Sequence, residues 1–412
     1  VFANPEELLR YLSIIQNGQR RVATEDIEIG GQTIKAGEGI IIDLSPANWD
    51  AAAFPDPELL DLQRPDADKN LAFGYGRHQC VGQQLARAEL HHCATRVAAL
   101  QGGACPAFEA LAARSAAHGT QCIVAVGGGS CSDTGKAVAL LMAEGGRLAD
   151  HASRFTPPDR LHVPVLSRPK LPIVSIPCTA SGAEVTPSLG VRDAEGKKLL
   201  FTDPQLASRV VLLDPQANVQ VPAALMLSTG MNGVAHCLEG LYSKERSPLA
   251  ELLALDALQR FAQALPEVQA QPQSVSARAQ LLYAAHLSGL VLVNARTALH
   301  HAVCHAIGSV TGAPHGQANA VLLPHALRFN RPVVAAALER ARAVLPGQMD
   351  AIAWVEQLAA QLGVPQRLRE IGVPREALAK IAHKTMGERG LYFNPRQVLE
   401  AGEILDLLEQ AY

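Results

Sequence analysis

The chain has 412 residues, which is long enough for two or three domains of about 100–200 residues each. Hydrophobic residues make up 48% of the sequence and charged residues 18%, and the formal net charge of −3 lacks the basic excess that nucleic-acid binding requires. No apolar run approaches the roughly 20 residues that span a bilayer, and no signal-peptide pattern opens the chain. The composition therefore predicts a cytoplasmic protein without nucleic-acid or membrane partners.

Residues 1–100 are predicted to form short elements around a cysteine loop. A short helix is expected at 5–12, and Gly-Gly at 30–31, between alternating apolar positions, predicts a hairpin with a primed turn. The cysteine loop at 73–82 leads directly into a predicted helix at about 82–100.

The cysteine loop is the most distinctive motif of these residues. It has the sequence FGYGRHQCVG, in which glycines let the backbone approach a porphyrin and the following helix directs its amino end toward the sulfur. This loop, together with Glu7 and Arg10 of an ExxR helix and the segment 54–64, resembles bacterial cytochromes P450. The resemblance implies that Cys80 ligates haem iron and that His78 contacts a haem propionate. Because about 100 residues supply only one face of a haem site, we do not expect haem to be held stably.

Residues 101–103, with the sequence QGG, break this pattern and are the predicted domain boundary. A helix is expected at 106–117, and three continuous apolar strands follow, at 122–126, 173–176 and 210–213. Such strands, separated by helices, indicate a parallel sheet. After about residue 216 the strand signal ends and helical periodicity continues to Tyr412.

The predicted fold is therefore α/β followed by all-α. The expected domains are a cytochrome P450-like fragment at 1–100, a dinucleotide-binding α/β domain at 101–216 and a helical active-site domain at 217–412. Only residues 105–121 precede the first strand, fewer than a βαβ unit of about 30 residues needs, so the dinucleotide-binding domain is predicted to be truncated.

A glycine turn, Gly127-Gly128-Gly129-Ser130, follows the first of these strands and opens a helix. Backbone amides and the amino end of a helix form a cradle for a pyrophosphate, and the Ser130 hydroxyl adds a donor. The turn therefore predicts a dinucleotide site.

Histidines concentrate in the helical part. Asn232 and His236 lie four residues apart on one face of a predicted helix, and His301 and His315, 14 residues apart, bracket His305. Two ligand-type side chains at i and i+4 with a later histidine pair are typical of a four-ligand metal site or an acid/base cleft.

Three motifs resemble the iron-containing (group III) alcohol dehydrogenases: GGGSxxDxxK at 127–136, the loop 177–186, and HAVCH at 301–305. The resemblance covers about residues 101–412 and implies NAD(P)H as cofactor, a small-molecule substrate and a homodimer. It implies cofactor contacts from Gly127, Gly128, Gly129, Ser130, Asp133, Lys136, Thr179 and Lys198. It implies catalytic roles for His305, His236, His301 and His315, and Asn232, His236, His301 and His315 as ligands of Fe²⁺ or Zn²⁺.

Two branches of that superfamily stay open. The metal-dependent alcohol dehydrogenases carry an aspartate at the position of Asn232. The maleylacetate reductases resemble this chain at Asn232 and in the segment 299–305. Asp133, in contrast, is more typical of the alcohol dehydrogenases. Without the carboxylate, metal binding should be weaker. The first expectation is thus a maleylacetate reductase-like NAD(P)H-dependent oxidoreductase. The alternatives are a metal-dependent alcohol dehydrogenase, a cytochrome P450 haem-binding fragment and an inactive chimera.

Overall fold

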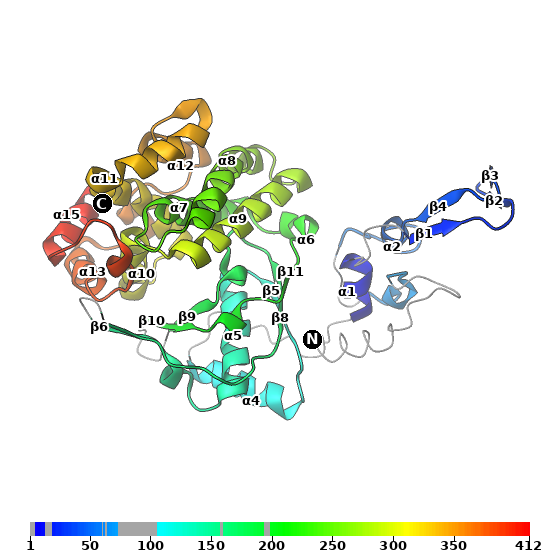
Figure 1. Cartoon of the computed structure of the whole chain (residues 1–412), viewed down its shortest axis with the longest axis horizontal. Coiled ribbons are helices and arrows are strands. Elements are labelled where there is room, and N and C mark those ends of the chain that lie inside the picture. Colours follow the sequence, from blue (N-terminus) through cyan, green and yellow to red (C-terminus); the bar gives the residue numbers. More distant parts are fainter. Residues whose placement is uncertain are drawn as a thin grey trace. The chain divides into compact units, whose positions relative to one another are not determined.

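The computed structural model describes residues 5–12, 19–59, 61, 64–72, 105–156, 160–192 and 198–412. The chain divides into two compact units, Val1–Ala99 and Leu100–Tyr412 (Figure 1). Among the described residues, no helix is both long enough and apolar enough to cross a membrane. The predicted haem contacts His78 and Cys80 and the predicted helix 82–100 lie outside the described residues.

The first unit contains short helices and two antiparallel strand pairs. Its described elements are α1 (Pro5–Leu12), β1 (Gln19–Val22), β2 (Ile27–Ile29), β3 (Gln32–Ile34), β4 (Gly39–Ile42), α2 (Ser45–Asn48) and a 3-10 turn (Ala67–Lys69). β1 pairs with β4, and β2 pairs with β3. The predicted hairpin is confirmed, since Gly30 and Gly31 both have positive φ, at 58° and 78°, as a primed turn requires.

A buried ion network fastens α1 to the segment that precedes Arg64. The Glu7 carboxylate accepts hydrogen bonds from Arg10 Nε at 2.7 Å and from Arg64 Nε at 3.1 Å, and all three side chains are buried. Arg10 also donates to the carbonyl of Asn48 at 2.9 Å. Because buried charges are costly unless they are paired and hydrogen-bonded, this network fixes the relative position of these segments within the unit.

The second unit begins with the predicted parallel sheet. Its strands are β5 (Ile123–Gly127), β8 (Ile173–Pro177) and β11 (Val210–Val211), in the order β11-β8-β5, and both pairs are parallel. Within the described residues the sheet ends at β5, as the short stretch before that strand predicts. Helices α4 (Cys105–Ala117) and α5 (Gly129–Glu144) form an apolar core with it, and α5 begins within the glycine turn, at Gly129.

Two antiparallel hairpins were not expected. They join β6 (Arg154–Thr156) to β7 (Arg160–His162) and β9 (Ser188–Arg192) to β10 (Lys198–Thr202). Their strands are short and carry polar or charged residues, so they lack the continuous apolar runs from which the parallel strands were predicted.

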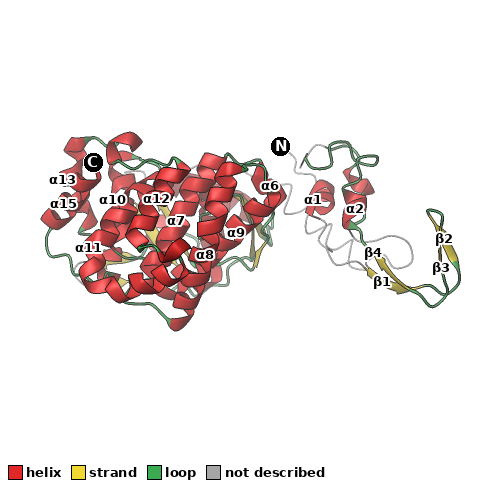
Figure 2. Ribbon diagram, turned by 90° about the horizontal axis from the view of Figure 1, so that it is seen from above, coloured by secondary structure: helices red, strands yellow, loops and turns green. Residues whose placement is uncertain are grey.

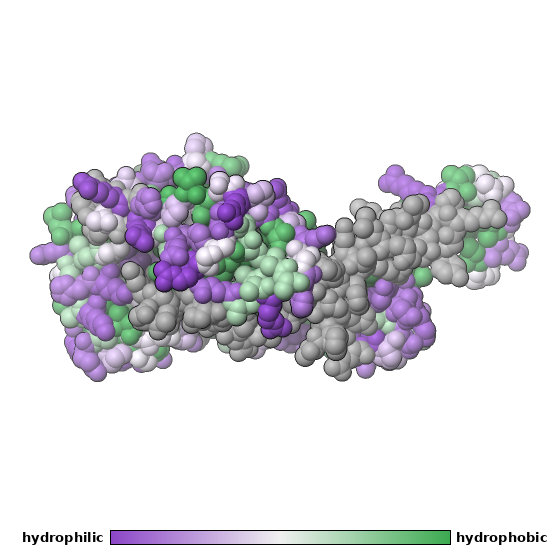
Figure 3. All heavy atoms as spheres, turned by 90° about the horizontal axis from the view of Figure 1, so that it is seen from below, coloured by the Kyte–Doolittle hydropathy of each residue, from purple (hydrophilic) through white to green (hydrophobic). Residues whose placement is uncertain are grey.

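Helices form the rest of this unit, as predicted (Figure 2). They are α6 (Pro215–Val219), α7 (Ala223–Tyr242), α8 (Pro248–Ala270), α9 (Val275–Ala295), α10 (Leu299–Thr311), α11 (His315–Val344), α12 (Ala351–Leu362), α13 (Leu378–Thr385), α14 (Gly390–Phe393) and α15 (Ala401–Ala411). The coloured residues on the face drawn in Figure 3 mix hydrophilic and hydrophobic side chains.

Helix α7 lies at the centre of this bundle and is buried along most of its length. Its glycines permit close contact with the neighbouring helices: a Cβ at Gly233 would lie 2.4 Å from the Phe261 ring, and one at Gly240 would lie 2.2 Å from Val291. This packing holds the α7 face that carries Asn232 and His236 in a fixed position.

Candidate functional site

A single cleft of about 720 Å³ joins the glycine turn of the α/β part to the histidines of the helical part. Its walls include most of the residues predicted from the sequence: Gly128, Gly129, Ser130, Asp133, Thr179, Asn232, His236, His301, His305 and His315. Two predicted cofactor contacts, Gly127 and Lys136, are not among the described residues that line the cleft, and the Lys198 side chain lies outside the described residues. Two motifs more than 100 residues apart in sequence thus meet in one site.

The glycine turn packs closely against the loop that contains Thr179. Gly127 has a φ of 140°, and a Cβ at Gly128 would lie 3.0 Å from Thr179 Cγ2. A Cβ at Gly129 would lie 3.3 Å from Ser181 Oγ, so side chains on this turn would fill the space against the loop. No side chain caps the amino end of α5. The turn therefore has the open helix terminus and small residues that a pyrophosphate needs.

Lys136 faces away from this cradle. Its ammonium group is fully buried and donates to the carbonyls of Ala183 and Ser188, at 2.6 and 3.0 Å, and to Thr186 Oγ1 at 3.1 Å. Burial lowers the pKa of Lys136, and the charges of Asp133 and Glu184 oppose that effect. The contact between Lys136 and the cofactor stays a prediction; in this structure the Lys136 ammonium donates to the 183–188 loop, which lies beside the turn.

The histidines come together from three helices. His236 lies on α7, His301 and His305 lie on α10, and His315 begins α11. The rings of His236 and His301 stack with their centroids 4.8 Å apart, and those of His305 and His315 stack at 5.6 Å. His301 and His315 are separated by 6.0 Å, so all four imidazoles form one cluster on the cleft wall.

Asn232 links two of these rings. Its Oδ1 lies 3.1 Å from His301 Nε2, and its Nδ2 lies 3.4 Å from His236 Nε2. In this arrangement the amide Nδ2 donates to His236 Nε2, and Oδ1 faces His301 Nε2. Burial strongly lowers the pKa of His236, and the neighbouring histidines lower it further, so a neutral His236 suits its role as acceptor.

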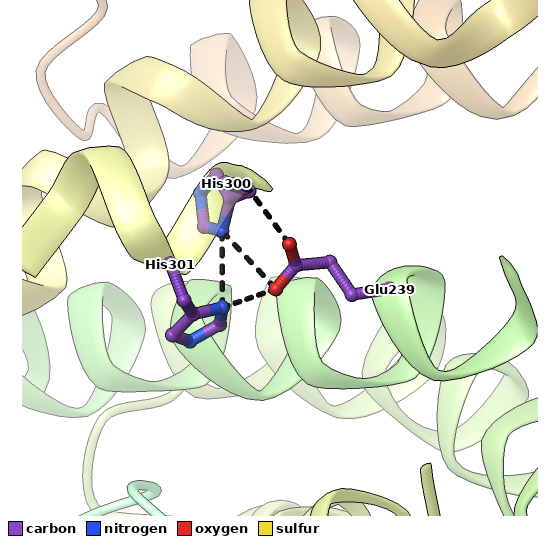
Figure 4. A group of neighbouring side chains, drawn as sticks. All are labelled: Glu239, His300 and His301. Atoms are coloured by element: carbon purple, nitrogen blue, oxygen red, sulfur yellow. Dashed lines mark hydrogen bonds and ion pairs between the residues drawn. The ribbon is translucent and has the colours of Figure 1, made fainter. Parts of the chain in front are cut away.

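Glu239, which no sequence motif indicated, contacts the histidine cluster through His301 (Figure 4). Its carboxylate accepts from His301 Nδ1 and from the backbone amides of Ala298 and His300, at 3.1 and 2.9 Å. Burial raises the pKa of Glu239, whereas His300 and the backbone donors lower it. Its position three residues after His236 and seven after Asn232, on one face of α7, was the signal that could have revealed it.

Two sets of side chains could hold a metal ion, and they differ in access. Glu239, His300 and His301 bring their donor atoms together, but the Glu239 oxygens already accept N–H groups and neither Glu239 nor His300 lines the cleft. The second set, Asn232, His236, His301 and His315, faces the cleft. Its imidazoles suit Fe²⁺ or Zn²⁺, whereas its amide is a neutral replacement for an anionic ligand. The residues of the second set therefore fit a divalent metal, but weakly.

Comparisons with known proteins separate the same two parts of the chain. Residues 104–215 match the iron-containing alcohol dehydrogenase family, and residues 226–412 match the C-terminal domain of the Fe-containing alcohol dehydrogenase family. Residues 5–98 match the cytochrome P450 family.

Individual relatives follow this division. A maleylacetate reductase of Sphingobium indicum is 34% identical over 303 residues, which cover 74% of this chain and 77% of that protein. The crystal structure of a maleylacetate reductase from Agrobacterium tumefaciens is 30% identical, with a TM-score of 0.66, and the match covers 80% of this chain and 86% of the other. Cytochrome P450 CYP105Q4 of Mycobacterium marinum is 80% identical over 85 residues, which cover 21% of this chain and 20% of that protein.

Proposed function

Because the chain belongs to the iron-containing alcohol dehydrogenase family, it is an NAD(P)-dependent oxidoreductase of a small-molecule substrate, and we propose that it reduces maleylacetate. One observation carries the proposal: a single cleft connects the glycine cradle to a histidine cluster in which Asn232 stands between His236 and His301. In this chain an amide thus occupies the position at which a metal-dependent enzyme needs a carboxylate.

The cradle end of the cleft would bind the cofactor. We assign the pyrophosphate to the turn at 127–130, where the α5 terminus and the Ser130 hydroxyl supply donors, with Thr179 beside it. Asp133 accepts from the backbone amide of Gly190 at 3.2 Å and so ties α5 to the cleft wall. Bound NAD(P)H supplies a hydride to an electron-poor carbon of the substrate.

The histidines at the other end of the cleft would donate a proton to the substrate. We assign the general acid to His305, whose Nδ1 lies 3.6 Å from Glu388 Oε2 and whose ring stacks with that of His315. A carboxylate beside an imidazole stabilises its protonated form, which can donate to the oxyanion that develops on a conjugated ketone. His236 and His301, held through Asn232, would keep the cluster ordered.

A metal-dependent alcohol dehydrogenase is the second candidate, because three imidazoles and Asn232 face the cleft. Fe²⁺ or Zn²⁺ held by Asn232, His236, His301 and His315 would polarise a carbonyl oxygen. Asn232 favours the first candidate over this one.

The first unit carries a separate prediction. Its match to cytochrome P450 supports Cys80 as a haem-iron ligand and His78 as a propionate contact. This alternative requires that full-length protein supplemented with haem show the absorption band of a thiolate-ligated iron–CO complex after reduction, although one face of a haem site is not expected to hold haem stably. Protein that stays colourless would rule this out.

Three broader features are also proposals. We infer that the protein forms a homodimer, which light scattering of purified protein would test. We also infer that the chain has three domains, at 1–100, 101–216 and 217–412. We also infer a cytoplasmic location; the five cysteines found free in the described residues are consistent with a reducing compartment.

The reaction can be tested directly with purified full-length protein. Reduced nicotinamide should be consumed when maleylacetate is added, and His305→Ala should lower kcat by about 10²-fold or more, as loss of a general acid does. His383→Ala, on the exposed face of α13, is the matched control and should leave turnover intact. Absence of turnover by the unmodified protein, with NADH and with NADPH, would contradict the proposal.

A further inference from the structure

Two arginines line the cleft without forming an ion pair to another described side chain. Arg296 and Arg389 are both half-buried in the same cleft as His305. Among the described residues, neither guanidinium group makes a hydrogen bond or an ion pair; Arg389 lies over the Phe393 ring at 5.9 Å. Because the described residues engage neither guanidinium group in a hydrogen bond or an ion pair, both can bind an anionic ligand in the cleft.

The backbone at Arg296 is strained. Arg296 follows the last residue of α9 with a φ of 65° and a ψ of 159°, a conformation that only glycine adopts readily. A glycine there would satisfy the backbone, yet the chain carries a long cationic side chain directed to the cleft. Strain of this kind concentrates at functional sites, where the side chain must occupy a set position.

The charge of Arg389 adds to that of Arg296 in the cleft. Burial lowers the pKa of Arg389, the positive charge of Arg296 lowers it further, and the charge of Glu388 opposes both effects. The neighbouring carboxylate, Glu388, lies 3.6 Å from His305 Nδ1. A bound anion would offset the two positive charges, and guanidinium groups recognise carboxylates through paired N–H donors.

We propose that Arg296 and Arg389 form a carboxylate-binding subsite that selects dicarboxylate substrates. The inference rests on the proposed function and specifies its substrate class. Thr297 and Ser309 line the same cleft, and their side-chain hydroxyls are hydrogen-bond donors that a carboxylate can use. His305 lines the same cleft, and Glu388, which precedes Arg389, lies 3.6 Å from it, so a substrate anchored at the arginines can reach His305.

Binding can be measured without turnover. Calorimetry with succinate, a dicarboxylate that the proposed reaction does not reduce, should detect binding to the full-length protein, and dimethyl succinate should not bind. Arg296→Gln and Arg389→Gln should each weaken succinate binding by about 10- to 100-fold, the loss expected for charge-assisted hydrogen bonds. Arg209→Gln removes an exposed charge outside the cleft and is the matched control. Unaltered succinate affinity in both cleft variants would overturn the proposal, as would no binding by the unmodified protein.

Arg296→Gly separates the subsite from a structural role. Glycine relieves the strained backbone, so the melting temperature should rise by about 2 °C or more while succinate binding weakens. Full succinate affinity in this variant would overturn the subsite.

The subsite and the proposed reaction can also fail independently. If succinate binding depends on both arginines but the protein does not reduce maleylacetate, the proposed reaction is wrong and the subsite is supported. The opposite result is also distinguishable. If both glutamine variants still turn over maleylacetate and still prefer it to its ester as the unmodified protein does, the subsite is wrong and the proposed reaction is retained.

Discussion

Glu239 and His301 are joined by a buried hydrogen bond between a carboxylate oxygen and Nδ1, which directs His301 Nε2 toward Asn232. The same carboxylate accepts from the backbone amides of Ala298 and His300, so it also fixes the first turn of α10. A carboxylate behind a histidine sets both the orientation of the ring and the nitrogen that carries the proton. Glu239 is therefore a positioning residue for the cluster.

Glu239→Gln tests this relationship. The glutamine oxygen can still accept from the backbone amides, but its NH₂ group cannot accept from His301 Nδ1–H. We expect the His301 tautomer to change, visible in the ¹⁵N chemical shifts of its ring, and kcat to fall by about 10- to 100-fold. Glu245→Gln, exposed beyond the end of α7, is the control. If His301 keeps its tautomer in Glu239→Gln, the positioning role is wrong.

A substitution of Lys136 tests whether this residue supports the 183–188 loop or binds the cofactor directly. Lys136→Met leaves the carbonyls of Ala183 and Ser188 without their donor, so we expect a loss of about 3 kcal/mol in the free energy of unfolding, measured with urea. The exposed Lys380→Met should be neutral. A large increase in the KM for NAD(P)H with unchanged stability would instead indicate a phosphate contact.

Asn232 controls the affinity of the cleft for metal. Asn232→Asp adds an anionic oxygen beside three imidazoles, so we expect Fe²⁺ and Zn²⁺ to bind about tenfold more tightly or better. Asn232→Leu removes the oxygen donor and should weaken binding. Calorimetry with the metal ion alone measures both variants. Equal affinity in the two would show that the residue at this position does not contribute a ligand.

The local motifs were predictable because their chemistry depends on short spacings. The glycine turn requires neighbouring small residues between a strand and a helix, and Asn232 and His236 share a face because they are four residues apart. The parallel sheet followed from continuous apolar strands, and α7 through α15 from helical periodicity.

The remaining site residues depend on tertiary packing. Arg296 follows α9 and Arg389 precedes α14, so nothing in the sequence between them indicates that they line one cleft. The spacing of Lys136 places it on α5, but only the position of the 183–188 loop shows which way its ammonium points. Such contacts are invisible to motif spacing.

Stability should fall in mild acid because of His325, which lies on α11 away from the cleft lining. Burial, reinforced by the positive charges of Arg328 and Arg367, lowers the pKa of His325 to about 4. Because this pKa lies below that of the unfolded chain, about 6.5, the folded state disfavours the proton. The stabilising contribution is complete above about pH 6.5 and is lost as the pH falls toward 4. His325→Gln should therefore reduce the difference in unfolding free energy between pH 7.5 and pH 5, whereas exposed His383→Gln should not. An unchanged pH dependence in His325→Gln would show that another group causes the loss.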